Sequence, residues 1–322
     1  MAESKIKIET MRESDFEEVR KVFVAAWADY FSNTGQQKPV KPRTDLNYRA
    51  HLESAPDGCF VAKECGKVIG SIFSHVWGKV GWFGPLEVSP EYQNKGIGRM
   101  LIDASLKYLE KSGCETIGLE TMPASNKNIA LYVKFGFAPV CTTIRMAKNL
   151  TKSENGGNAG AREPTFQVIE VSETNCTEAL KAIQRISNAV HSGLDYTKEI
   201  EVALRLNLGK TFLLLKGKRI IGFALLYTYQ AVEGAEGAGI RILAVEPRHT
   251  SEDAMFALLS ACEKQAKSAG KKELGFFFYT GSGVQIKSLL ESGYSITNCL
   301  VRMLKNGNTG KPDALHFSRW SG

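Results

Sequence analysis

The chain repeats itself at a fixed spacing of 157 residues, and this repeat limits it to two copies of one framework. Adding 157 takes residues 86–90 (Leu-Glu-Val-Ser-Pro) to residues 243–247 (Leu-Ala-Val-Glu-Pro). The same offset takes Gly113 to Gly270, and no gap is needed between these positions. The spacing is too long for a solenoid repeat and predicts two domains of one kind.

The length of the chain agrees with this interpretation, because 322 residues are typical of about two domains. A polar, glycine-rich stretch lies between the copies and has almost nothing to bury, which predicts a linker. We therefore expect one domain over residues 1–148, a linker over residues 149–164 and a second domain over residues 165–322.

Within the first copy, the pattern between residues 84 and 137 predicts a strand, a glycine-rich turn, a helix, a strand and a helix. A final strand or hairpin follows. This mixture places the chain in the α/β (α+β) class. The expected elements are a strand at 85–88, a helix at 99–111, a strand at 116–121, a helix at 126–134 and a strand at 137–146.

The turn at residues 93–98 (Gln-Asn-Lys-Gly-Ile-Gly) carries the first chemical signal. Gly96 and Gly98 let backbone N–H groups converge at the N-terminus of a helix, where the helix dipole favours an anion. This is the chemistry of a diphosphate cradle. A Gly-x-Gly sequence also occurs in ordinary tight turns. The flanking residues are therefore needed to distinguish a diphosphate-binding loop from such a turn.

Those flanking residues resemble the GNAT family of acyl-CoA-dependent N-acyltransferases. Residues 93–98 match its Gln/Arg-x-x-Gly-x-Gly/Ala pyrophosphate loop, and residues 131–137 (Leu-Tyr-Val-Lys-Phe-Gly-Phe) match its closing helix. The resemblance is strong over residues 5–148 and weaker over residues 165–305. It implies two tandem GNAT-like domains, each a twisted mixed sheet with splayed central parallel strands flanked by helices. Acetyl-CoA would lie in the cleft between those strands.

The resemblance also implies the residues that hold the cofactor. The N–H of Val88 would polarise the thioester carbonyl. Asn128 is a candidate for holding the pantetheine arm, and Ser125 stands where the family often has asparagine. The pyrophosphate would be held by the backbone of Gln93, Asn94, Lys95, Gly96, Ile97, Gly98 and Arg99.

Two residues are candidates for catalysis. Tyr132 occupies the family's tyrosine position and would protonate the departing thiolate; the alternative is a core tyrosine on a helix. Glu120 matches a strand glutamate in members that acetylate protein N-termini and would act as the base; the alternative is a solvated carboxylate at a strand end. Glu87 is a second candidate base. Some members of the family keep a base at the position of Trp82, where this chain has no carboxylate. A water relay to Glu120 is therefore a third possibility.

The second copy lacks the glycine loop. The offset takes residues 93–98 to residues 250–255 (Thr-Ser-Glu-Asp-Ala-Met), which contain no glycine. Glu252 and Asp253 place negative charge where a pyrophosphate would lie. We expect this loop not to bind a diphosphate.

The second copy also lacks both catalytic candidates, because Tyr132 becomes Leu289 and Glu120 becomes Phe277. We therefore expect the second domain not to bind acyl-CoA, but to pack on the first and help shape the acceptor pocket. The tail at residues 314–320 predicts an extra strand that crosses back to the first domain. The candidate acceptor walls are Trp27, Tyr30, Phe31, Trp77 and Trp82, and the alternative for each is packing against the sheet or the partner domain.

The composition of the chain bears on three kinds of partner: nucleic acid, membranes and metal ions. The net charge of +7 is divided evenly between the halves, so a nucleic-acid groove is not indicated. The sequence has no run of eighteen apolar residues and no signal core at its start, so we expect no membrane partner and a cytoplasmic location. Seven cysteines without a Cys-x-x-Cys pair predict reduced thiols, and the five histidines show no metal-ligand spacing.

These patterns lead to one functional hypothesis and two alternatives. We expect an acetyl-CoA-dependent N-acetyltransferase, active in the first domain and without a metal. Its acceptor would be a small molecule, an amino-acid derivative or a peptide N-terminus. The first alternative is a non-catalytic acyl-CoA-binding or regulatory protein. In the second, the tandem resembles thiol-conjugate acetyltransferases with two such domains.

Overall fold

The computed structural model describes residues 6–151 and 166–318, so most of the expected linker at 149–164 lies outside the described residues. The first half contains β1 (Lys7–Thr10), α1 (Phe16–Asn33), α2 (Asp45–Ser54), β2 (Phe60–Glu64), β3 (Lys67–Trp77), β4 (Val80–Val88), α3 (Ile97–Lys111), β5 (Thr116–Thr121), α4 (Asn126–Lys134) and β6 (Ala138–Asn149). Short 3-10 turns η1 (Glu13–Asp15) and η2 (Pro90–Tyr92) precede α1 and α3.

The second half repeats this order and adds one strand. It contains β7 (Gln167–Glu170), α5 (Cys176–Val190), α6 (Thr197–Arg205), β8 (Gly209–Lys216), β9 (Arg219–Tyr227), β10 (Gly237–Val245), η3 (Pro247–His249), α7 (Glu252–Ser268), β11 (Glu273–Tyr279), α8 (Ile286–Glu291), β12 (Ser295–Asn306) and β13 (His316–Ser318). The mixed architecture of the two halves confirms the predicted fold class.

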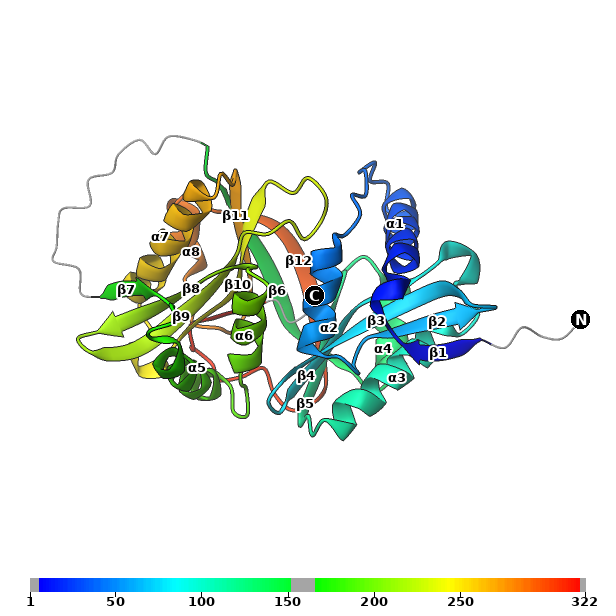
Figure 1. The fold of residues 1–322 in the computed structure, drawn as a ribbon, viewed down its shortest axis with the longest axis horizontal. Coiled ribbons are helices and arrows are strands. Elements are labelled where there is room, and N and C mark those ends of the chain that lie inside the picture. Colours follow the sequence, from blue (N-terminus) through cyan, green and yellow to red (C-terminus); the bar gives the residue numbers. More distant parts are fainter. Residues whose placement is uncertain (1–5, 152–165, 319–322) are drawn as a thin grey trace, which may run out of the picture.

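The two halves exchange their last long strands. β12 of the second half lies between β5 and β6 of the first half and is antiparallel to both. β6 in turn pairs with β11 of the second half. All strands therefore join one continuous sheet in the order β1-β2-β3-β4-β5-β12-β6-β11-β13-β10-β9-β8-β7, and Figure 1 shows β6 and β12 side by side at its centre.

Helices cover both faces of this sheet. In the first half, α3 packs with apolar residues of β3 and β4, whereas α1 packs on the opposite face of β3. In the second half, α7 covers one face and α5 and α6 cover the other. The core under α5 and α6 includes Trp77 and Trp82 of the first half, so the halves share a hydrophobic core.

The two central parallel strands of the first half separate after a short pairing. β4 pairs with β5 only from Val80 to Trp82, opposite residues 116–118. The register between β3 and β4 shifts after Ile72, which is the mark of a bulge, and a bulge bends its strand. Beyond Trp82, β4 has a paired edge toward β3 and an unpaired edge toward β5. This is the predicted splay.

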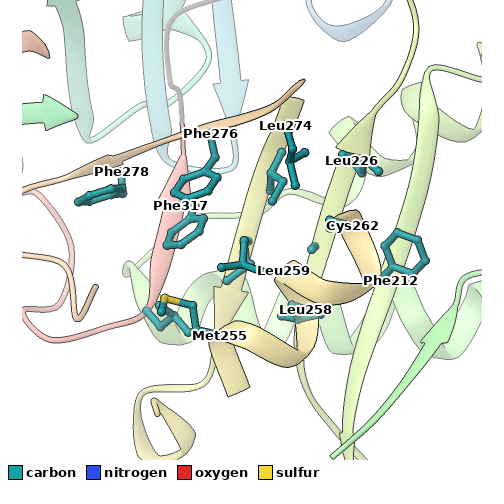
Figure 2. Packing of buried hydrophobic residues seen from close by; sticks show 14 of the residues in the cluster. Phe212, Leu226, Met255, Leu258, Leu259, Cys262, Leu274, Phe276, Phe278 and Phe317 are labelled. Carbon is teal, nitrogen blue, oxygen red and sulfur yellow. The ribbon is translucent and has the colours of Figure 1, made fainter. Parts of the chain in front are cut away.

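In the second half, β13 fills the corresponding gap. It is antiparallel to β10 and pairs with β11 through Phe317 opposite Phe278. The ring of Phe317 stacks on that of Phe276 with 4.5 Å between centroids, and Figure 2 shows the two rings in contact. The prediction that the tail crosses to the first domain was wrong for its described residues. β12 crosses instead, and residues 314–318 stay in the second half.

Candidate active site

The glycine loop leaves the N-terminus of α3 without internal hydrogen bonds. Asn94 and Gly96 both adopt positive φ angles, 63° and 84°. The first N–H of the helix to find a carbonyl is that of Met100, which donates to Gly96 over 3.2 Å. Within the described residues, the N–H groups at positions 97–99 donate no hydrogen bond. Such a set of unsatisfied donors is suited to an anion.

The space above these donors is open. A Cβ atom added to Gly96 would have no neighbour within 4 Å, and one added to Gly98 would meet only the Leu86 side chain at 3.9 Å. Gly96 is needed for its left-handed conformation, whereas Gly98 has ordinary helical geometry. The glycines therefore keep the backbone approachable.

Three cationic side chains surround the loop. Lys127 Nζ donates to Gln93 Oε1 over 3.5 Å, and Gln93 Nε2 donates to the Val88 carbonyl over 3.4 Å. Lys95 and Arg99 are exposed on the loop and on the first turn of α3. Their positive charge adds to that of the helix N-terminus and favours an anionic ligand.

The N–H of Val88 faces the splay. Ser89 N–H donates to Ile69 across the β3–β4 pair over 2.9 Å. Bonding direction alternates along an antiparallel pair, so Val88, which lies opposite Gly70, directs its N–H and C=O away from β3. The side away from β3 is the unpaired edge, so this donor is available to a ligand between β4 and β5.

The second half shows what such a donor can bind. Val245 is the residue 157 positions after Val88, and its N–H donates to the carbonyl of Leu315 over 3.0 Å. The carbonyl belongs to the segment that leads into β13. A backbone carbonyl of the chain itself thus occupies, in the second half, the place that remains open beside Val88.

The N-terminus of α7, the counterpart of α3, has a side-chain cap that α3 lacks. Ser251 caps the helix by accepting a hydrogen bond from Ala254 N–H over 3.2 Å. Glu252 and Asp253 follow in the first turn. These groups already supply the negative charge that a helix N-terminus favours.

The α4 helix carries three of the predicted residues. Ser125 immediately precedes it and makes no side-chain cap, and Asn128 is half-buried in its first turn. Tyr132 is buried and packs against Phe83 and Phe137. Burial raises the pKa of Tyr132, so its hydroxyl keeps its proton. That hydroxyl has no hydrogen-bond partner in the described part of the chain.

Glu120 lies at the junction between the halves. Its carboxylate accepts hydrogen bonds from Arg302 Nη2 over 2.7 Å and from Thr143 Oγ1 over 2.6 Å. Arg302 belongs to the exchanged strand β12, and neither side chain of this ion pair is exposed. The glutamate is therefore a buried, charge-paired group rather than a solvated strand end.

Glu87 has a similar environment on β4. Its carboxylate is paired with Arg43 at 3.0 Å and accepts a hydrogen bond from Trp27 Nε1 over 3.3 Å. Ser71 donates to it over 3.4 Å. Both candidate bases thus carry an arginine partner that the sequence analysis did not single out. For Arg302 the signal existed, because the repeat places Arg145 at the equivalent position.

The five aromatic residues expected at the acceptor pocket fall into two groups. Trp77 and Trp82 are buried in the core shared by the halves. Trp27, Tyr30 and Phe31 are half-buried on α1, where their rings pack against one another. The α1 group is therefore the part of the predicted set that lies near a surface.

Metal-site clusters and membrane-spanning helices are both absent from the described residues, 6–151 and 166–318. No group of three or more His, Cys, Asp or Glu side chains in that part of the chain has the arrangement of a metal site. No helix there is long and apolar enough to cross a membrane.

Sequence comparison agrees with the geometry of the first half. The sequence model of the Acetyltransferase (GNAT) family matches residues 19–137. N-alpha-acetyltransferase MAK3 of Arabidopsis thaliana is 30% identical over 105 residues, which are 31% of this chain and 55% of that protein. Mycothiol acetyltransferase of Propionibacterium freudenreichii is 27% identical over 151 residues, 44% of this chain and 46% of that protein. The chain spans about half the length of the curated relatives that it matches.

Structural comparison extends the likeness to the whole chain. A tandem GNAT protein from the clavulanic acid biosynthesis pathway superposes with a TM-score of 0.60 at 12% identity, covering 95% of this chain and all of that one. At this identity the likeness concerns the fold. The GNAT acetyltransferase family model thus matches residues 19–137, and the chain as a whole has the fold of a tandem GNAT protein.

Proposed function

We propose that this protein transfers the acetyl group of acetyl-CoA to an amine, and that the reaction takes place in the first half only. The observation that carries the proposal is the pair Val88 and Val245. The N–H of Val245 holds a carbonyl of the chain's own tail, whereas the N–H of Val88 faces an open gap. A thioester carbonyl in the first gap would receive the same hydrogen bond.

The rest of the first half suits the remaining parts of CoA. The donors at positions 97–99, together with Gln93, Asn94, Lys95 and Gly96 of the loop, would hold the pyrophosphate. Ser125 and Asn128 lie at the start of α4 and would bind the pantetheine arm. Support for this placement comes from the open space at Gly98 and from the exposed cations around the loop.

The reaction needs a neutral amine whose lone pair attacks the thioester carbon. The C–N bond forms, the C–S bond breaks, and the Val88 N–H stabilises negative charge on the carbonyl oxygen. The proton of the Tyr132 hydroxyl would pass to the leaving thiolate, and solvent would then return a proton to the tyrosine. Its unpartnered hydroxyl and the burial that keeps it protonated support this role.

A base has to accept the proton of the amine. The sequence analysis left three possibilities: Glu120 directly, Glu87, or a water relay to Glu120. Glu120 is held by Arg302 in a site without solvent exposure, so an amine would reach it through a water relay. Glu87 lies beside Trp27, on the side of the sheet that α1 covers. We propose Glu120 acting through water, with Glu87 as the alternative.

The acceptor is an amine of a class represented among the relatives. The matched proteins are, by their names, an N-alpha-acetyltransferase and a mycothiol acetyltransferase. The rings of Trp27, Tyr30 and Phe31 would contact a peptide N-terminus, an amino-acid derivative or another small amine. In the second half, β13 in the splay and the capped α7 support a purely structural role.

Release of free CoA thiol from acetyl-CoA tests the proposal. The full chain is given a panel of short peptides, amino-acid derivatives and small amines, and acetylated products are identified by mass spectrometry. We expect acceptor-dependent thiol release with at least one member. Tight CoA binding without release for any acceptor would favour the alternative, a non-catalytic acyl-CoA-binding or regulatory protein.

Parallel measurements on Glu120→Gln and Glu87→Gln identify the base. The variant of the true base should lose about 100-fold or more in kcat at neutral pH, with unchanged acetyl-CoA affinity. If both variants keep wild-type turnover, neither carboxylate is the base.

A further inference from the structure

A cavity lies between the two halves, away from the glycine loop and α4. Its volume is about 260 Å³. One wall is the α2 helix of the first half, with Asn47, Ala50 and His51, and the opposite wall is the start of β10 and β11. A cavity of about 150 Å³ suffices for benzene in a protein core, so this one holds a ring with a substituent.

The cavity exists because a tryptophan in the first half is a glycine in the second. Trp82 pairs with Gly118 across the two parallel strands, and its ring lies over that glycine: a Cβ atom there would be 2.1 Å from the indole. The offset of 157 takes this pair to Gly239 and Gly275, which also pair. The second half therefore repeats the glycine of the second strand, Gly275, which we call the glycine floor. It has no indole at the position of Trp82.

An arginine side chain lies near the glycine floor in each half. The guanidinium of Arg302 lies over the Trp82 ring, 5.3 Å from its centroid. The equivalent arginine of the first half, Arg145, lies over Gly275, where a Cβ atom would be 2.9 Å from its Nη2. Glu273 holds Arg145 in place through an ion pair of 2.6 Å. In the second half the Arg145 guanidinium thus covers Gly275, and the space over Gly239 stays open, because a Cβ atom there would meet only the Gly275 carbonyl oxygen at 3.9 Å.

The remaining walls are aromatic and polar. His51, His75, Tyr227, Tyr229 and Phe277 contribute rings. The charges at the wall are matched, because Arg241 is paired with Glu199 at 2.9 Å. The Tyr227 hydroxyl donates to Glu199 over 2.9 Å, and the Tyr229 hydroxyl accepts from Asn47 Nδ2 over 2.9 Å. A flat ring with at most weak charge fits this lining better than a strong anion or cation.

We propose that this cavity is a second small-molecule site, which binds a planar aromatic or heteroaromatic group beside Gly239, in the space that the missing tryptophan side chain leaves in the second half. The ring would lie on Gly239, against the Arg145 guanidinium that covers Gly275. This site does not depend on the acetyl-transfer proposal, because its contacts lie outside the glycine loop and α4.

Indole is the probe, since it is the side chain that the repeat has lost. Calorimetric titration of the full chain without acetyl-CoA should show saturable binding of one indole per chain. Gly239→Trp fills the cavity from β10, and Gly239 can accept a side chain because its Cβ would meet only the Gly275 carbonyl oxygen, at 3.9 Å. Ala50→Phe fills it independently from α2. Ala269→Phe makes the same change at an exposed site at the end of α7.

Both filling variants should weaken indole binding at least tenfold, and Ala269→Phe should leave it unchanged. Circular dichroism verifies that each variant is folded, and Ala50→Phe decides if Gly239→Trp does not fold. No saturable binding to the wild type, or equal binding by the folded filling variants, would overturn the proposal.

Tryptamine with acetyl-CoA then distinguishes two sources of the ring. If tryptamine is acetylated and Ala50→Phe raises its KM at least tenfold, the ring belongs to the acceptor. If indole binds but tryptamine is not acetylated, the ring belongs to a separate ligand. Either result is compatible with the site. Failure of indole binding leaves the acetyl-transfer proposal standing, so the two can fail separately.

Discussion

Tyr132 is the residue whose surroundings fit its predicted chemistry most closely. Its ring is fixed by Phe83 and Phe137, and its hydroxyl keeps its proton because burial disfavours the phenolate. Removing that hydroxyl changes neither the packing of the ring nor the glycine loop. The effect of its removal therefore belongs to proton transfer.

Tyr132→Phe should lower kcat about 100-fold and change the Kd for acetyl-CoA by less than twofold. Steady-state kinetics and calorimetry measure the two quantities. Tyr108→Phe is the control, since Tyr108 is a partly buried tyrosine on α3 that packs against Phe60. An unchanged kcat in Tyr132→Phe would remove this residue from the mechanism.

Arg302 and Arg145 allow the exchanged strands to be tested at single residues. Arg302→Met leaves Glu120 buried without its cation, which should cost about 3–5 kcal/mol of unfolding free energy. Arg145→Met, at the equivalent position, breaks a partly exposed pair with Glu273 and should cost about 1 kcal/mol or less. Denaturant unfolding measures both. Equal losses would contradict the different burial of the two pairs.

The ionisation of Glu199 should make the unfolding free energy depend on pH in the acid range. Burial by itself would raise its pKa, but Arg241 and the hydrogen bond from Trp77 lower the value from 4.5 to about 2. A lowered pKa contributes stability that is present above pH 4.5 and is lost as pH falls toward 2. The contribution is about 3 kcal/mol.

The unfolding free energy of the wild type should therefore fall between pH 5 and about pH 2, and Glu199→Gln should show a shallower fall over the same range. Urea unfolding at several pH values provides the measurement. Parallel curves for the two proteins would mean that Glu199 does not control this transition.

At the scale of elements, the local pattern was sufficient where each element packs on its own neighbours. The predicted bounds of β5 and α4 agree with the structure, and α3 begins two residues earlier than expected. The apolar pattern could not tell which sheet edge the last strand of each half would join, because β12 presents the same alternation to either partner. The exchange of β6 and β12 and the place of β13 therefore required the structure.

The same limit applies to the candidate site. The loop at residues 93–98 was visible because its glycines and its position before a helix are local features. The partner of Glu120 was not, since Arg302 lies 182 positions away and meets it only through the exchanged strand. The cavity beside Gly239 depends in the same way on contacts between the halves.

A substitution at the N-terminus of α3 should change acetyl-CoA affinity and protein stability in opposite directions. Gly98→Asp places a carboxylate at a helix N-terminus, which should stabilise the helix by about 0.5 kcal/mol or more. The same charge should repel a pyrophosphate and weaken acetyl-CoA binding at least 100-fold. Gly98→Ala is the control and should retain binding, because its Cβ meets only Leu86. Thermal unfolding and calorimetry measure the two effects.

If Gly98→Asp binds acetyl-CoA as the wild type does, the N-terminus of α3 is not the pyrophosphate site. A loss of both binding and stability would instead indicate general damage to the loop.

At the scale of the molecule, two copies of one framework have acquired different states. The first keeps its central gap open beside Val88, and the second closes its gap with β13 through the Val245–Leu315 hydrogen bond. Phe317 anchors that closure by stacking on Phe276. The exchange of β6 and β12 makes the closed copy a structural part of the open one, because it supplies Arg302 to Glu120.

The stoichiometry of acetyl-CoA binding to the full chain tests this account most directly. Calorimetric titration should give one site per chain, with binding abolished by Gly98→Asp and unchanged by Glu252→Gln in the second half. Two sites per chain, or a single site that Gly98→Asp does not affect, would contradict it.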